Sequence, residues 1–311
     1  MTYLEKKKKK RWGKKFIDKR NWSVYSEQLV KRGEYWFDLD EVKNWDHELE
    51  EMNKAKEGRP YQFPNSMIQV QAIWHAKGYN YREIEGMTRV LVKKAELRAY
   101  NDYSTVNRRV NALELTFLAP KDNHLILGSD GTGMQAKSGG EYMREKYGKK
   151  NRVWIQLVVI GDAKHHEPLS IEANIIHESE SNSTQRQIVE LLKQGYTIER
   201  LLGDGGLDKI SLWNFCEDQE IEPIIKPDKN ALEDTDSTAR NRAVKERNKK
   251  GYKKWARKHK YGFRWPATEG IYSATKKIFG EELRATSEKG LLQEAKIKFW
   301  AYQRLKRAGE A

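Results

Sequence analysis

The spacing of apolar residues predicts a helical first part of the chain. Apolar side chains recur every three or four residues, as on one face of an α-helix, over residues 67–77, 81–94 and 104–115. Gly78 is placed to end the first of these helices, and Asn101-Asp102 to begin the third. The segment before them, residues 22–57, is rich in aromatic and acidic side chains and predicts one or two further short helices.

The third predicted helix gathers its polar side chains on one face. Its inward positions are Val106, Val110 and Leu113, and its outward positions are Asn107, Arg108, Arg109 and Asn111. A helix-turn-helix module uses such exposed polar side chains to reach base edges in the major groove of DNA. The same pattern fits an ordinary helical bundle with a solvated polar face, so both interpretations stay open.

The pattern changes to β-structure at residue 124. Strand-like apolar runs, joined by turn-rich segments, occupy residues 124–127, 153–160 and 169–176. Because no helix is clearly signalled between them, they predict an antiparallel meander. Helices and strands then alternate over residues 184–194, 198–202, 207–219 and 221–225, which implies parallel crossovers. Two more helices are predicted over residues 268–279 and around 291–305.

This order of elements defines a fold class. Three adjacent strands followed by αβαβ is the order of a ribonuclease H-like domain, a mixed five-stranded sheet with helices on both faces. The sequence therefore predicts an α/β protein in which such a domain follows an α-helical, helix-turn-helix-like domain. A polar segment, residues 228–260, would interrupt the α/β domain after its last strand.

Charge is distributed unevenly along the chain. The 311 residues hold 59 Lys and Arg against 45 Asp and Glu, a formal net charge of +14. Residues 1–20 carry +8 and residues 240–260 carry +10, so the remainder sums to −4. A local excess of this kind points to a polyanion, with nucleic acid as the leading candidate. Residues 1–20 also fit a merely solubilising tail.

The second basic segment mixes aromatic side chains with its cations. Lys253 and Lys254 lie between Tyr252 and Trp255. Aromatic rings among cations can stack on bases while the cations contact phosphates. We therefore expect Lys253, Lys254 and Trp255 to contact DNA.

Several other classes of protein are disfavoured. The chain has no run of eighteen apolar residues, and its basic N-terminus is not followed by an apolar segment, so neither a membrane span nor a secretory signal is expected. Cys216 is the one cysteine, which rules out an internal disulfide and fits a reducing compartment. The glycine-rich residues 128–133 match neither a P-loop nor a dinucleotide fingerprint.

Two aspartates stand where predicted strands end in glycine-rich turns. Asp130 lies between Ser129 and Gly131, and Asp204 lies between Gly203 and Gly205. Each alone fits a plain turn. On neighbouring strands of one sheet, however, the two carboxylates would converge on a divalent cation such as Mg²⁺, and the glycines would leave room for a phosphate backbone.

Glu269 is a third candidate acid, on the predicted helix 268–279. Lys276 follows seven residues later, almost two turns on, and shares its face. The carboxylate could complete a metal site and the ammonium could bind a phosphate, although an exposed pair on a surface helix also fits. Two metal ions held by carboxylates can activate a nucleophile at phosphorus and stabilise the leaving oxygen.

The order Asp130, Asp204, Glu269 resembles the DDE triad of prokaryotic insertion-sequence transposases, specifically the insertion-sequence-five type. That family's signature is Tyr-x2-Arg-x3-Glu-x6-Lys. Tyr261, Arg264, Glu269 and Lys276 are similar to it, with one extra residue between the arginine and the glutamate.

The resemblance implies a function for these residues. Asp130, Asp204 and Glu269 would be the catalytic ligands of Mg²⁺ or Mn²⁺, and Tyr261, Arg264 and Lys276 would contact DNA. The implied reaction is hydrolysis at the ends of a transposon, followed by attack of the freed 3′-hydroxyl on target DNA. The N-terminal domain would bind the terminal inverted repeats through Asn107, Arg108 and Arg109.

We therefore expect a basic arm at residues 1–20, a helical DNA-binding domain at 21–120 and a ribonuclease H-like catalytic domain at 121–311, with the basic insertion 228–260 inside it. The expected partners are double-stranded DNA and a second copy of the chain in a homodimer. The expected location is the prokaryotic cytoplasm. Two alternatives stay open: a non-catalytic DNA-binding relic, and a metal-dependent nuclease that cuts without joining.

Overall fold

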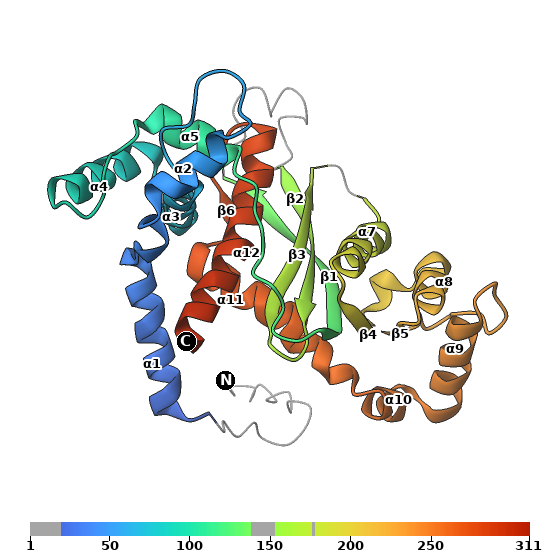
Figure 1. Ribbon diagram of the computed structural model, residues 1–311. Coiled ribbons are helices and arrows are strands. Elements are labelled where there is room, and N and C mark those ends of the chain that lie inside the picture. Colours follow the sequence, from blue (N-terminus) through green and yellow to red (C-terminus); the bar gives the residue numbers. More distant parts are fainter. Residues whose placement is uncertain (1–19, 138–152, 176–177) are drawn as a thin grey trace, which may run out of the picture.

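The computed structural model describes residues 20–137, 153–175 and 178–311 (Figure 1). All but the last residue of the predicted basic arm lies outside the described residues. No helix in these three ranges is long and apolar enough to cross a membrane.

A mixed β-sheet forms the centre of the molecule. The sheet has the strand order β3-β2-β1-β4-β5, and its strands are β1 (His124–Ala136), β2 (Trp154–Asp162), β3 (Glu167–Asn174), β4 (Thr197–Gly203) and β5 (Glu222–Ile225). β1, β2 and β3 pair antiparallel, whereas β4 pairs parallel with β1 and β5 pairs parallel with β4. This arrangement confirms the predicted meander and crossovers. A two-residue strand that the sequence did not predict, β6 (Glu282–Leu283), pairs with the far end of β1.

Helices cover both faces of this sheet, as predicted (Figure 1). One face packs against α11 (Ile271–Phe279) and α12 (Glu288–Glu310), and the other against α7 (Glu180–Lys193) and α8 (Ile210–Asp218). β2 is almost continuously apolar because it is buried from both sides; eight of its nine residues are buried.

In the described residues before the sheet there are five α-helices: α1 (Trp22–Glu34), α2 (Trp45–Asn53), α3 (Asn65–Lys77), α4 (Tyr81–Lys93) and α5 (Tyr103–Asn111). α3, α4 and α5 are the three helices that the apolar spacing predicts. Glu85 of α4 accepts a hydrogen bond from the Tyr103 backbone N–H at 2.8 Å, and Asp102 caps the same end of α5. The start of α5 is therefore fixed against α4.

The last helix joins the N-terminal helices to the sheet. α12 contributes Trp300 to a core that also contains Ile68 of α3, Val106 of α5 and Leu157 of β2. Its Gln303 exchanges two hydrogen bonds with the backbone of Leu118 in the segment that leads into β1. The helical part and the α/β part therefore share one continuous hydrophobic core.

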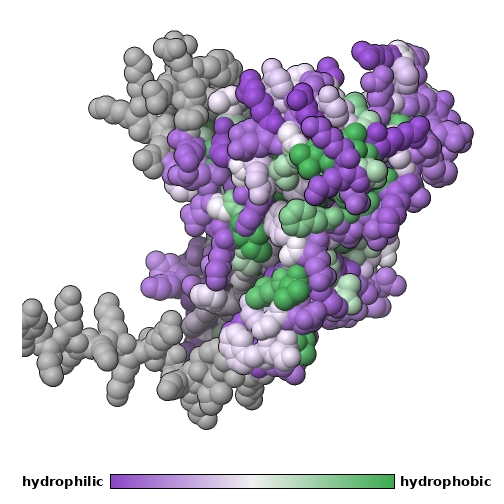
Figure 2. All heavy atoms as spheres, turned by 90° about the vertical axis from the view of Figure 1, so that its left-hand side faces the viewer, coloured by the Kyte–Doolittle hydropathy of each residue, from purple (hydrophilic) through white to green (hydrophobic). Residues whose placement is uncertain are grey.

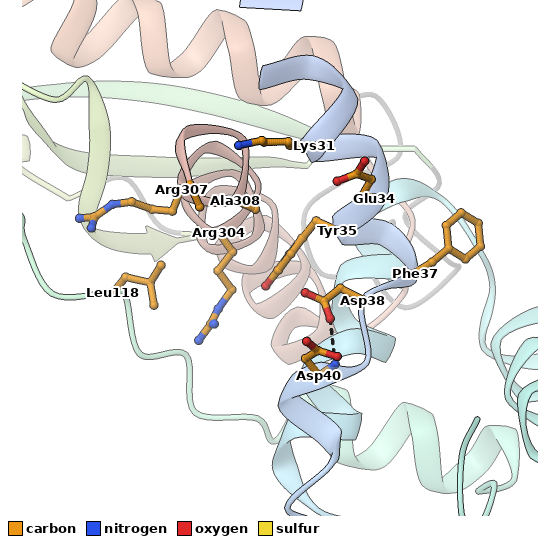
Figure 3. A pocket seen from close by; sticks show the side chains of 11 residues that line it. Lys31, Glu34, Tyr35, Phe37, Asp38, Asp40, Leu118, Arg304, Arg307 and Ala308 are labelled. Atoms are coloured by element: carbon orange, nitrogen blue, oxygen red, sulfur yellow. Dashed lines mark hydrogen bonds between the residues drawn. The ribbon is translucent and has the colours of Figure 1, made fainter. Parts of the chain in front are cut away.

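The outer face of the helical part is mostly hydrophilic, with smaller hydrophobic patches (Figure 2). α1 contributes no buried side chain, and it exposes Trp22, Val24, Leu29 and Val30. It rests on α12 at Gly309, where a Cβ atom would lie 2.6 Å from the carbonyl oxygen of Gln28. A cavity of about 750 Å³ lies between α1 and the end of α12 (Figure 3).

The basic insertion folds into α9 (Thr238–Lys250) and α10 (Tyr252–Lys258). Some of its cations form ion pairs within the fold. Arg240 is buried and donates to both carboxylate oxygens of Asp208, at 2.8 and 2.9 Å. Glu246 accepts from Lys250 and Lys258 at 2.6 Å each.

Candidate functional site

Asp130 and Asp204 lie side by side because their strands are neighbours. β1 and β4 run parallel with Ser129 opposite Gly203. The next residue on each strand, Asp130 or Asp204, therefore lies at the same level of the sheet, at the end of β4. Asp204 follows β4, as predicted. Asp130 does not stand in a turn, because it is the middle residue of β1, which continues through the glycine-rich residues to Ala136. The expectation of a turn at Asp130 was wrong.

Glu180 is the acid that the sequence interpretation missed. Among the described residues, one carboxylate oxygen from each of Asp130, Glu180 and Asp204 lies within 4.8 Å of the others. We call these three residues the acidic cluster. The predicted helix began at residue 184, whereas α7 begins at Glu180 and presents this side chain from its first turn. An acid directly before the apolar run of a helix was the available signal, since carboxylates favour helix N-termini.

The neighbouring glycines make room for Glu180. A Cβ atom on Gly131 would lie 1.9 Å from Glu180 Oε1, and one on Gly206 would lie 3.4 Å from Glu180 Oε2. The absence of a side chain at Gly131 therefore lets the Glu180 carboxylate approach β1. We had expected these glycines to leave room for a phosphate backbone, but at Gly131 a protein carboxylate takes that space.

Arg264 connects Asp130 to the predicted third acid, Glu269. Its guanidinium donates to Asp130 Oδ2 at 2.9 Å and lies 3.9 Å from Glu269 Oε1. Arg264 and Asp130 are buried, while the Glu269 side chain is about half exposed. The structure thus brings Glu269 beside the acidic cluster, on the side of Asp130 that carries the arginine.

A π-helical turn explains how Arg264 and Glu269 meet despite their spacing. The predicted helix 268–279 starts with the π-helix Pro266–Gly270, which we call the π-turn, and continues as α11. A π-helix closes its hydrogen bonds over five residues where an α-helix uses four. It therefore accommodates the extra residue between Arg264 and Glu269 and keeps both on one face.

The π-turn sits directly on the sheet. A Cβ atom on Gly161 of β2 would lie 2.0 Å from the Ala267 carbonyl oxygen, and one on Gly128 of β1 would lie 2.7 Å from Ala267 Cβ. These two glycines let the backbone of the turn approach the sheet closely. This close packing fixes the distance of the π-turn from the sheet, and with it the position of Glu269 relative to Asp130.

Two tyrosines hold the backbone around the acids. Tyr272 of α11 donates its hydroxyl to the carbonyl oxygen of Asp130, and Tyr261 donates to that of Gly203 at 3.1 Å. Burial, together with the nearby carboxylates, raises the pKa of Tyr272 well above its ordinary value, so its hydroxyl remains a donor.

The carboxylates give this site a negative electrostatic potential. Burial raises the pKa of Asp130 to about 6, and the carboxylates of Asp204 and Glu269 add to that rise, while the Arg264 guanidinium opposes it. A bound cation would relieve this repulsion. The donor set consists of carboxylate oxygens, which are the ligands that Mg²⁺ and Mn²⁺ favour. The residues present therefore fit a divalent metal ion.

Several residues that we expected on DNA have other positions. Trp255 is 1% exposed and packs against Tyr261 and Ala267, so the expectation that it stacks on bases was wrong. Tyr261 and Arg264 are also buried, each less than a tenth exposed, and they contact the site's backbone and carboxylate instead. Lys253 and Lys254 are exposed on α10.

The polar face of α5 is divided between two roles. Asn107 and Arg108 are exposed, as predicted. Arg109 is only partly exposed, and it donates to the Phe63 carbonyl oxygen at 3.1 Å and to Asn65 Oδ1 at 2.8 Å. It is therefore not an outward-facing residue, since its guanidinium holds the loop before α3. Lys276 lies in the last turn of α11 and is partly exposed.

The sheet order, the helices on both faces and the acidic cluster define a ribonuclease H-like α/β fold of the DDE type. Two family models, both described as transposase DDE domains, match residues 30–138 and 122–302. The second match spans more than half of the chain, so the protein belongs to the DDE transposase family. DDE domains of this kind depend on divalent metal ions and act on DNA. No curated protein matches the chain.

Proposed function

We propose that the protein is a transposase of the insertion-sequence-five type. It would cut DNA at the terminal inverted repeats of its element and join the freed 3′-hydroxyl ends to target DNA, with Mg²⁺ or Mn²⁺ as cofactor. The observation that carries this proposal is the acidic cluster, whose three carboxylates meet within 4.8 Å on a ribonuclease H-like sheet.

Asp130, Asp204 and Glu269 are the proposed catalytic residues and metal ligands, and Glu180 is a fourth ligand beside them. Bound metal ions would supply activation of the attacking oxygen and stabilisation of the leaving oxygen. Arg264 orients Asp130 through its hydrogen bond of 2.9 Å. Lys276 is proposed to contact a DNA phosphate next to the site.

The proposed DNA contacts lie in two parts of the chain. Residues 21–120 form the DNA-binding domain, with Asn107 and Arg108 of α5 facing the terminal repeats. Lys253 and Lys254 of the insertion guide DNA toward the acids of the catalytic domain, residues 121–311. The proposed assembly is a homodimer in the prokaryotic cytoplasm, and the exposed apolar side chains of α1 support a second copy as the protein partner.

The direct test uses the DNA that flanks the coding region. The protein is incubated with a duplex that carries those ends, a target plasmid and MgCl₂ or MnCl₂. We expect 3′-hydroxyl ends at the element boundary and covalently joined products, both resolved on sequencing gels. Binding without cleavage in either metal would favour the relic, and cleavage without joining would favour a nuclease.

Metal binding should depend on pH in a defined direction. Because the pKa of Asp130 is raised to about 6, this carboxyl is mostly protonated at pH 5 and a metal ion must displace its proton. We expect the affinity for Mn²⁺ to rise about tenfold per pH unit below 6 and to level off above 7. Isothermal titration calorimetry at pH 5, 6, 7 and 8 measures this dependence. Equal affinity at pH 5 and pH 7 would exclude Asp130 as a ligand.

A further inference from the structure

A basic pocket lies beside the start of α5, away from the acidic cluster. The cavity has a volume of about 470 Å³ and is enclosed by the loop between α2 and α3 and by residues 100–109. We call it the loop pocket. Its cations are Lys56, Arg59, Arg108 and Arg109, of which Arg108 belongs to the exposed face of α5.

The charge of the loop pocket is strongly one-sided. Asp102 is the one acid among the described residues that line it, and this carboxylate accepts hydrogen bonds from the backbone N–H groups of Ser104 and Thr105 at 3.0 Å each. It is therefore committed to capping α5. Within the described part of the chain, none of the four cations forms an ion pair with a carboxylate. The pocket thus holds an excess of positive charge.

The walls of the loop pocket are fixed by the fold. Asn53 exchanges two hydrogen bonds with the backbone of Tyr61, at 2.7 and 3.0 Å, and so closes the loop. The Tyr61 ring lies 4.9 Å from Lys56 Nζ and 4.5 Å from Arg109 Cζ, within the range of cation–π contacts. Arg109 is held in turn by Phe63 and Asn65. The cations therefore surround a preformed hollow.

The larger cavity beside α1 differs from the loop pocket in the charge of its lining (Figure 3). Among the described residues that line it, three cations balance three acids: Lys31, Arg304, Arg307, Glu34, Asp38 and Asp40. An anion would gain little there from the net charge. The excess of cations is a property of the loop pocket and not of every hollow on this part of the surface.

From these observations we propose that the loop pocket binds a backbone phosphate of duplex DNA, adjacent to the bases that α5 faces. Arg59 and Arg108 are exposed and contact the phosphate, whereas Lys56, Arg109 and Tyr61 shape the pocket around it. The contact positions α5 in the groove and carries no sequence information itself. This inference rests on the proposed function in one respect, namely that α5 contacts DNA.

The test compares the salt dependence of DNA binding among charge variants of the full chain. The probe is a 30-base-pair duplex of mixed sequence, because a phosphate contact does not require the element's own ends. We expect Lys56→Ala/Arg59→Ala to bind about tenfold more weakly at 100 mM KCl, and its plot of log affinity against log salt to be shallower by about one to two units. The matched control is Lys43→Ala/Lys193→Ala, which removes two exposed cations elsewhere.

A second variant tests the shape of the pocket at constant charge. Tyr61→Leu removes the ring that lies against Lys56 and Arg109, and we expect weaker binding with an unchanged salt slope. Thermal melting followed by circular dichroism shows that each variant is folded before its affinity is compared.

The outcomes separate the loop pocket from the proposed function. Equal losses in the pocket variant and the control would show that only bulk charge matters and would overturn the proposal. Parental affinity in both pocket variants would also overturn it while leaving the proposed function intact. Failure of the parent protein to bind any duplex would instead overturn the proposed DNA-binding role of α5, and the pocket with it.

Discussion

Asp130→Asn is expected to reduce metal-dependent DNA cleavage by about a thousandfold. A metal ion contributes several kcal/mol to stabilisation of the transition state, and each ~1.4 kcal/mol corresponds to a factor of ten in rate. Asparagine keeps the size of the side chain but removes the charge that the ion requires. The rate of 3′-end formation on the element's ends, in MgCl₂ and in MnCl₂, measures the effect.

The control for this substitution is Asp218→Asn, which removes one exposed carboxylate at the end of α8. We expect it to cleave at the parental rate. Asp130→Asn should still bind the ends, because the proposed DNA contacts lie on other residues, namely those of α5, α10 and the loop pocket and Lys276 of α11. Cleavage at the parental rate by Asp130→Asn would remove this residue from the catalytic site.

One alanine inserted between Trp265 and Pro266 is expected to reduce cleavage by about a hundredfold, the loss that a misplacement of about 1 Å can cause. The π-turn already accommodates one residue beyond the α-helical spacing, and a further residue turns Glu269 away from Arg264. Six residues along an α-helix correspond to faces about 120° apart. Cleavage measured beside thermal melting followed by circular dichroism separates lost positioning from lost folding.

Deletion of Trp265 provides the matched counterpart. This side chain is 61% exposed, so its removal takes little from the core. The deletion leaves three residues between Arg264 and Glu269, a spacing of four positions, which a regular α-helix brings to within about 40° of one face. We expect activity within about tenfold of the parent, since misplacement by 1 Å costs about a hundredfold. If the variant with the inserted alanine instead cleaved DNA at the parental rate, Glu269 would not act from the helix face that it shares with Arg264.

The antiparallel meander, the parallel crossovers and the approach of Asp130 to Asp204 could be predicted because they depend on local patterns. Apolar runs and turns mark strands, and their alternation with helices indicates parallel crossovers. The prediction of a turn at Asp130 failed because glycine occurs both in turns and at strand positions where another part of the protein packs closely. Here Gly128 and Gly131 are strand residues that admit the π-turn and the Glu180 carboxylate.

Glu180 and Trp255 show where local patterns mislead. Glu180 precedes the apolar run that marks its helix, so amphipathic spacing placed the helix start four residues too late. Trp255 stands among cations in the sequence, and composition alone suggested an exposed ring. In the structure its indole is covered by Tyr252, His259 and Tyr261, because the insertion packs back onto the sheet.

The sequence by itself determined the class of fold, the two aspartates on adjacent strands and the basic character of the insertion. These follow from the spacing of apolar side chains and from charge, both of which are visible in the sequence alone. Only the tertiary structure decided which acids meet, which cations form contacts within the fold and which stay exposed. Such choices depend on contacts between residues far apart in the chain, as in the approach of Arg264 to Asp130 and of Glu180 to Gly131. The packing of α7 and of the π-turn against the sheet sets those distances.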